Sequence, residues 1–124
     1  MTLSESQINT IGLILHTWCG FHKTRRKYGL YISHCYVLLS FVWLESIDSE
    51  VSEGKVQRLL TMFQSIKLHY LFTFLISKGY IFLTRTSGRR NYYALTDSGR
   101  EVAALLLEGI EARQVAFFNK YLSK

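Results

Sequence analysis

The sequence predicts a single, mainly α-helical domain that carries one small β-hairpin. Its 124 residues suit one domain, and the hydrophobic content of 48% is enough to build a core. There is no proline, and apolar residues recur at helical spacing along most of the chain. Only between residues 80 and 96 does the pattern change to that of two strands around a glycine-containing turn.

Two helices are expected in the first third of the chain. The first covers residues 4–27, where Ser4 or Ser6 can cap its start and Gly29 can close its end. The second runs from residue 31 to about 46. It is apolar nearly all round, which indicates a buried central helix.

Two shorter helices follow after a turn. Ser52 is expected to cap the third helix, and Ser65 to cap a fourth helix over about 65–78 that Gly79 closes. The apolar residues of the third helix that are expected to face inward are Val56, Leu59 and Leu60. Those of the fourth helix are Leu68, Leu71, Phe72, Leu75 and Ile76.

A β-hairpin comes directly after the fourth helix. Its strands are expected at 80–85 and 90–96, joined by a turn at 86–89 with two arginines beside it. Two short helices followed by an Arg-tipped hairpin are the order of a winged helix-turn-helix. In that fold the second short helix enters the DNA major groove and the hairpin, or wing, reaches the neighbouring backbone or minor groove.

A long last helix is expected to begin with Thr96 or Ser98 as its cap and to reach about residue 122. Its apolar face is wider than one small core requires. We therefore expect one winged-helix domain over residues 1–124, in which residues 1–29 and 98–124 are dimerisation helices around a DNA-binding lobe at 30–97.

The charge distribution favours a polyanionic partner, double-stranded DNA in particular. The net charge is +6, and residues 55–100 alone hold eight cations against one acid, Asp97. Candidate DNA-contacting residues on the fourth helix are Ser65, Lys67, His69, Tyr70 and Thr73. Those on the wing, at about 81–96, are Arg85, Arg89, Arg90 and Asn91.

Two segments carry a resemblance to a known family. Residues 75–81 (LISKGYI) and 88–101 (GRRNYYALTDSGRE) resemble the MarR family of bacterial transcription regulators, and the run from Arg90 also resembles the PadR family. The resemblance implies a cytoplasmic homodimer on a pseudo-palindromic operator, released by a small aromatic effector. The wing departs from the MarR pattern at Ser87 and Gly88, where an Asp usually precedes a key Arg.

Alternative functions were weighed against this one. The aromatic fourth helix would also suit a protein-interaction module that lacks sequence-specific DNA binding. Cys19, which precedes several tyrosines, is a candidate peroxide-sensing thiol, although a free cysteine is more often a buried small hydrophobe.

Other classes find little support in the sequence. His16, Cys19 and His22 drift around their helix and cannot converge on one metal ion unaided. We find no phosphate-cradling loop, catalytic triad or carboxylate pair, so we expect neither an enzyme nor a cofactor. The apolar stretches are too short to span a membrane, and the start of the chain lacks a signal pattern.

Overall fold

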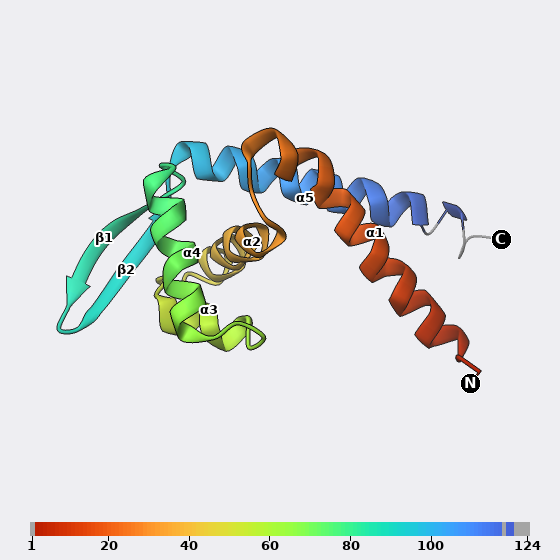
Figure 1. The fold of residues 1–124 in the computed structure, drawn as a ribbon, viewed down its shortest axis with the longest axis horizontal. Helices are drawn as coiled ribbons and strands as arrows, with labels where there is room; N and C mark the ends of the chain where they lie inside the picture. Colours follow the sequence, from red (N-terminus) through yellow and green to blue (C-terminus); the bar gives the residue numbers. More distant parts are fainter. Residues whose placement is uncertain (1, 118, 121–124) are drawn as a thin grey trace.

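The computed structural model describes residues 2–117 and 119–120, apart from the side chains of residues 9–10, 12–21 and 113–117. The fold is mainly α-helical with one antiparallel hairpin, as the sequence predicts. Its elements are α1 (Glu5–Tyr28), α2 (Ile32–Ser46), α3 (Glu53–Leu59), α4 (Ser65–Ser77), β1 (Ile81–Ser87), β2 (Arg90–Leu95) and α5 (Asp97–Phe117). Figure 1 shows α1 and α5 running beside each other, with the remaining elements gathered into a lobe at one end.

The core of the lobe is built around α2, which confirms the prediction of a buried central helix. Phe41 from α2 is fully buried and packs against Phe72 from α4, with ring centroids 5.6 Å apart. Phe72 in turn meets the edge of Tyr93 from β2 at 5.1 Å. These three rings connect the central helix, α4 and the hairpin, so the core fixes the position of the wing relative to α4.

Local capping signals account for several helix ends. Ser4, and not Ser6, caps α1, since its hydroxyl accepts from Gln7 N while the Gln7 side chain accepts from Ser4 N. Gly29 ends α1 with a positive φ of 66°. Ser52 caps α3 as predicted, because its hydroxyl accepts from Lys55 N.

The structure corrects one predicted cap and decides between two alternatives for another. Ser65 does not cap α4, because Gln64 occupies that position and the Ser65 hydroxyl instead donates to Gln57 on α3. At the start of α5 the cap is Thr96, whose hydroxyl accepts from Gly99 N, so Ser98 lies inside the helix. The expected end of this helix near residue 122 lies outside the described residues.

Two apolar residues that were predicted to face the core, Leu59 and Ile76, are exposed. Leu59 is 41% exposed and Ile76 is 43% exposed. Both lie in the last turn of a short helix. The helix α3 ends after Leu59, because Leu60 has left the helical conformation. Leu60 is buried in the core, as predicted, whereas Leu59 is not.

The hairpin extends further than the sequence predicts. β1 continues to Ser87 and pairs Ile81 with Leu95 at one end and Ser87 with Arg90 at the other, with an irregularity between Leu83 and Arg85. The expected turn over 86–89 therefore shrinks to two residues, of which Gly88 has a φ of 62°. The strands of the wing therefore pair up to the two-residue turn at 88–89.

Candidate nucleic-acid interface

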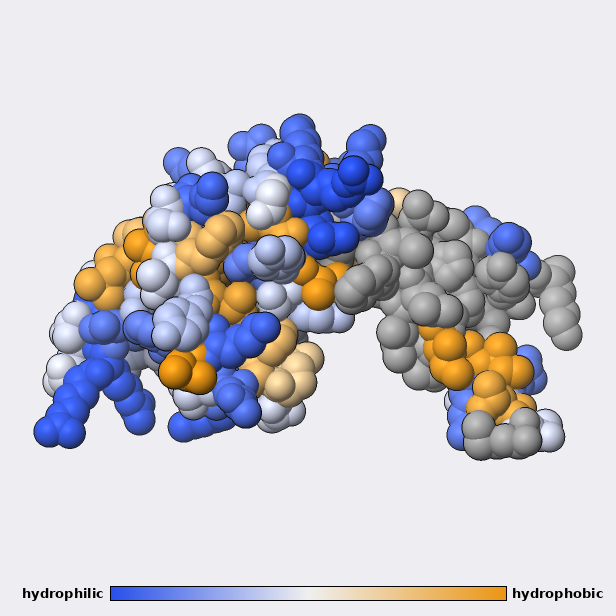
Figure 2. Space-filling view, viewed as in Figure 1, coloured by the Kyte–Doolittle hydropathy of each residue, from blue (hydrophilic) through white to orange (hydrophobic). Residues whose placement is uncertain are grey.

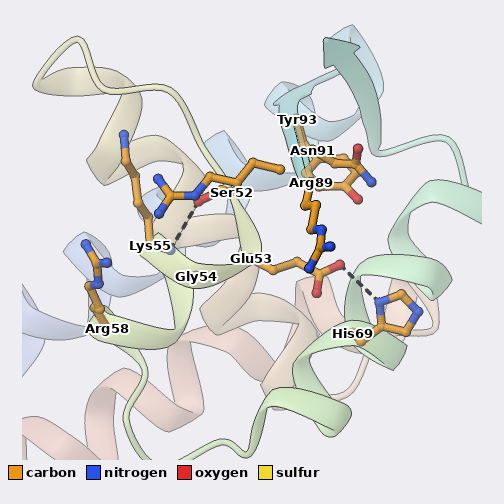
Figure 3. A pocket seen from close by; sticks show the side chains of 10 residues that line it. Ser52, Glu53, Gly54, Lys55, Arg58, His69, Arg89, Asn91 and Tyr93 are labelled. Atoms are coloured by element: carbon orange, nitrogen blue, oxygen red, sulfur yellow. Dashed lines mark hydrogen bonds and ion pairs between the residues drawn. The ribbon is translucent and has the colours of Figure 1, made fainter. Parts of the chain in front are cut away.

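A groove lies between the hairpin on one side and the helices α3 and α4 on the other (Figure 3). It encloses about 360 Å³. Its lining comes from α3 and its cap, from one residue of α4, and from the tip and return strand of the hairpin. The lining residues are Ser52, Glu53, Gly54, Lys55, Arg58, His69, Arg89, Arg90, Asn91 and Tyr93.

Cations from two elements face this groove. Lys55 and Arg58 come from α3, while Arg89 and Arg90 come from the hairpin tip. Among the residues that the structure describes, none of the four is paired with a carboxylate. The Lys55 ammonium is held in place by neutral acceptors, the Ser49 hydroxyl at 2.8 Å and a backbone carbonyl at 3.0 Å. The groove therefore concentrates positive charge from α3 and from the hairpin tip.

Glu53 is the one acidic residue of the lining, and its carboxylate contacts His69. The Nδ1 atom of His69 lies 3.1 Å from the Glu53 carboxylate, which joins α4 to α3 at the floor of the groove (Figure 3). The lining therefore carries four cations against one carboxylate.

Arg85 occupies a different place from the other wing arginines. Its guanidinium donates two hydrogen bonds of 2.7 Å to the carboxylate of Glu50, in the segment between α2 and α3. It also lies over the ring of Tyr92, 4.2 Å from the centroid. The hydrogen bond from Arg85 lowers the pKa of Glu50, and the same bond raises the pKa of Arg85.

This fork is a wing support that sequence reasoning missed. The Asp expected from the MarR pattern is replaced by Ser87 or Gly88. Instead, Glu50 of the lobe contacts Arg85 of the hairpin. A second contact acts nearby, because Val51 O accepts from Tyr93 N at 2.8 Å. The segment 50–51 therefore secures both strands of the wing.

The outer face of α4 carries part of the predicted set. Lys67, Tyr70 and Thr73 are exposed, and Tyr70 retains 65% of its accessible surface. The hydroxyl of Thr73 donates to the carbonyl of His69. Ser65 and His69, by contrast, are tied to α3 by the contacts described above.

Sequence reasoning missed three residues of this surface. Lys55 and Arg58 belong to the basic range 55–100, but the predicted interface includes only residues of the fourth helix and the wing. The available signal was that both lie on the helix directly before the fourth helix. Ile66, 62% exposed on α4, was passed over because an apolar residue is ordinarily assigned to the core.

The described thiol and the described metal-ligand side chains show no redox or metal site. Cys35 is fully buried, and burial raises its pKa to about 11, which is the opposite of an activated thiol. The side chain of Cys19, the candidate redox residue, lies outside the described residues, as does that of His16. Within the described part of the chain, no three His, Cys, Asp or Glu side chains gather as a metal site, and no helix is long and apolar enough to cross a membrane.

Comparison with solved structures supports the winged-helix architecture. Wild-type MarR from E. coli in its apo form aligns with a TM-score of 0.72 and 10% identity over 97% of this chain and 87% of that one. A MarR transcriptional regulator from Methanosarcina mazei Go1 gives 0.71 and 15% identity over 96% and 79%. Disulfide-formed AbfR aligns with a TM-score of 0.61 and 20% identity over 78% of this chain. The alignment covers 64% of the length of AbfR.

These likenesses establish the fold, which is the winged helix of the MarR regulators. No protein-family model and no curated protein matches the sequence. The resemblance of the wing to the PadR family stays a prediction.

Proposed function

We propose that this chain is a DNA-binding transcriptional regulator that acts as a homodimer on a pseudo-palindromic operator. The observation that carries the proposal is the groove beside the exposed face of α4. Its four cations, from α3 and the wing tip, have no carboxylate partner among the described residues. In this arrangement α4 enters the major groove, Lys55 and Arg58 neutralise phosphates, and the wing reaches the adjacent backbone or minor groove. Asn91 at the tip is a further donor toward the sugar-phosphate backbone.

The free end of α1 supports the homodimer. Leu3, Ile8 and Ile11 are 38%, 54% and 46% exposed, and Figure 2 shows apolar side chains gathered there. A monomer gains nothing from such a stripe, whereas a second copy would bury it. Two lobes joined through α1 and α5 would present their α4 helices about 34 Å apart, one turn of DNA. Sedimentation of wild type and of Ile8→Asp with Ile11→Asp tests this, and a monomeric wild type would contradict it.

The salt dependence of duplex binding tests the proposal. Each phosphate contact contributes about 0.9 to the slope of log K against log salt, so Arg89→Ala with Arg90→Ala is expected to reduce the slope by about 1.8 per protomer. Lys27→Ala with Lys78→Ala is the charge-matched control, because Lys27 lies in the last turn of α1 and Lys78 is the C-cap of α4, so neither belongs to the hairpin.

Equal slopes for the two double variants would contradict the assignment of the groove to DNA. A wild-type protein that bound no duplex at low salt would favour the second candidate, a protein-interaction module. The exposed Ile66 and Tyr70 on α4 are the observation that supports that candidate.

A second hollow supports control by a small effector. It encloses about 400 Å³ between α2 and α5, at the junction of the lobe with the proposed dimerisation helix. Val42 and Leu107 contribute apolar surface, and the Glu45–Arg100 ion pair of 2.8 Å stands at its side. This size and mixture suit a small aromatic molecule, which would act by changing the spacing of the two lobes. Phenol that neither bound wild type nor shifted its affinity for DNA would argue against such an effector.

A further inference from the structure

The outward face of α4 is apolar where a DNA-reading helix is ordinarily polar. The buried residues of α4 are Leu68, Leu71, Phe72 and Leu75, and the opposite side of the helix is therefore defined by Ile66, Tyr70 and Thr73. These three follow one another at helical spacing and form what we call the outer stripe. Ile66 is 62% exposed and Tyr70 is 65% exposed.

The residues that read guanine and adenine are nearly absent from this helix. Arg reads the acceptors of guanine, and Asn or Gln reads adenine, each through a pair of hydrogen bonds. Over residues 65–77 the sequence SIKLHYLFTFLIS contains no Arg, Asn, Gln, Asp or Glu. Its one lysine, Lys67, lies to the side of the outer stripe, and His69 is held by Glu53.

The outer stripe instead presents the aliphatic side chain of Ile66 and the ring of Tyr70 with its terminal hydroxyl. The hydroxyl proton of Thr73 is already donated to a backbone carbonyl and is not available to a base. The one apolar feature that distinguishes base pairs in the major groove is the C5-methyl group of thymine. We infer that the outer stripe, with Ile66 at its first position, recognises thymine methyl groups and so selects an A·T-rich half-site.

The charges around the stripe favour DNA over an apolar protein surface as its occupant. The groove with unpaired Lys55, Arg58, Arg89 and Arg90 lies on the adjacent side of α3 and the wing. A ligand that fits both must combine an apolar strip with flanking negative charge, as the thymine-bearing major groove between its phosphates does. The wing adds to the same preference, because arginines favour the narrow minor groove of A-tracts.

This inference rests on the proposed function, and it is tested with thymine and uracil. Duplexes are first selected from a random-sequence pool by the full chain, with A·T pairs expected to be enriched. Every thymine of the selected duplex is then replaced by uracil, which keeps all hydrogen-bonding groups and removes only the methyl. Burial of one methyl corresponds to roughly fourfold in affinity, so the uracil duplex is expected to bind roughly fourfold more weakly for each methyl contacted.

Two variants locate the effect. Ile66→Ala is expected to reduce the difference between thymine and uracil by up to the roughly fourfold of one methyl contact, whereas Ile76→Ala is expected to keep the difference unchanged. The latter is the matched control, since Ile76 lies on the same helix and is 43% exposed but stands off the outer stripe. Both positions are exposed, so both variants are expected to fold, and Tyr70→Ala provides an independent second change on the stripe.

The outcomes separate this inference from the proposed function. Salt-dependent binding with no sequence enrichment, or with equal affinity for thymine and uracil duplexes, overturns methyl recognition and leaves DNA binding in place. Ile66→Ala that discriminates as strongly as Ile76→Ala overturns the role of the outer stripe. Absence of any duplex binding at low salt overturns both.

Discussion

Gly99, in the first turn of α5, is the position where the structure predicts the largest effect of a single added carbon. A Cβ built on Gly99 would overlap the backbone carbonyl of Tyr80, and it would also lie 3.2 Å from the side chain of Leu95. The Tyr80 carbonyl cannot move aside, because it accepts a hydrogen bond of 3.0 Å from Thr96 N. This is the point where α5 crosses the start of the hairpin, and only a glycine allows the approach.

The expected cost follows from this overlap. Forcing a methyl into well-packed surroundings costs about 1–3 kcal/mol, and contact with fixed backbone places Gly99→Ala at or above the upper end. With an unfolding entropy of about 2.1 cal/mol/K per residue, 1 kcal/mol in a chain of this length shifts Tm by about 4 °C. A loss of about 3 kcal/mol therefore lowers Tm by about 12 °C.

Gly54→Ala is the matched control. Gly54 also lies in the first turn of a helix, but an added Cβ there would meet only the Ser52 hydroxyl oxygen, at 4.0 Å. Alanine favours the helix over glycine by up to about 1 kcal/mol, so Tm is expected to stay level or rise slightly. Thermal unfolding by circular dichroism at one fixed protein concentration compares the two variants with wild type. If Gly99→Ala melted no lower than Gly54→Ala, the close approach of α5 to Tyr80 would be refuted.

Three further predictions concern individual side chains. His34 is buried with its pKa lowered, first by burial and then by Lys67, and its Nδ1 accepts from Tyr31 N at 3.0 Å. Its contribution to stability is therefore complete above the ordinary histidine pKa and is lost as the pH falls below it, so His34→Phe is expected to flatten the acid limb of a denaturation profile. Glu50→Gln, which weakens the fork to Arg85, is expected to speed hydrogen exchange in the hairpin while the overall Tm changes little; unchanged exchange would count against the fork as a wing support. Cys35 is expected to resist a thiol reagent until the protein unfolds, because burial raises its pKa to about 11, and rapid labelling in native buffer would contradict its burial.

Local signals in the sequence were sufficient for most of the fold. The caps at Ser4 and Ser52, the left-handed Gly29 and the change of period after Gly79 each depend on residues within a few positions of one another. The run Leu-Thr-x-x-Gly, residues 95–99, is explained only in part by local structure. Its Thr96 caps α5, but the requirement for Gly99 arises from Tyr80, which only the folded chain brings near.

The candidate site was less predictable because its charges are sorted by distant partners. Arg85 and Glu50 are 35 residues apart in the chain, and Arg100 and Glu45 are 55 apart. No periodicity or spacing rule connects such pairs. Sequence reasoning therefore placed Arg85 with Arg89 and Arg90 as equal candidates for DNA contact, whereas the structure gives it a partner within the protein.

Three glutamates, Glu45 in α2, Glu50 in the connection and Glu53 in α3, divide the basic residues of this small domain into two groups. They contact Arg100, Arg85 and His69 respectively. Those three pairs join α5, the wing and α4 to one stretch of chain, so they define the geometry of the surface. The four cations of the groove, Lys55, Arg58, Arg89 and Arg90, are among those left without a carboxylate within the described residues, and phosphate would replace water as their partner. Loss of one of these arginines should chiefly reduce the salt dependence of DNA binding. Loss of Arg85 should disturb the position of the wing and also expose the charge of Glu50 to the DNA, so it is expected to lower affinity by more than one lost phosphate contact.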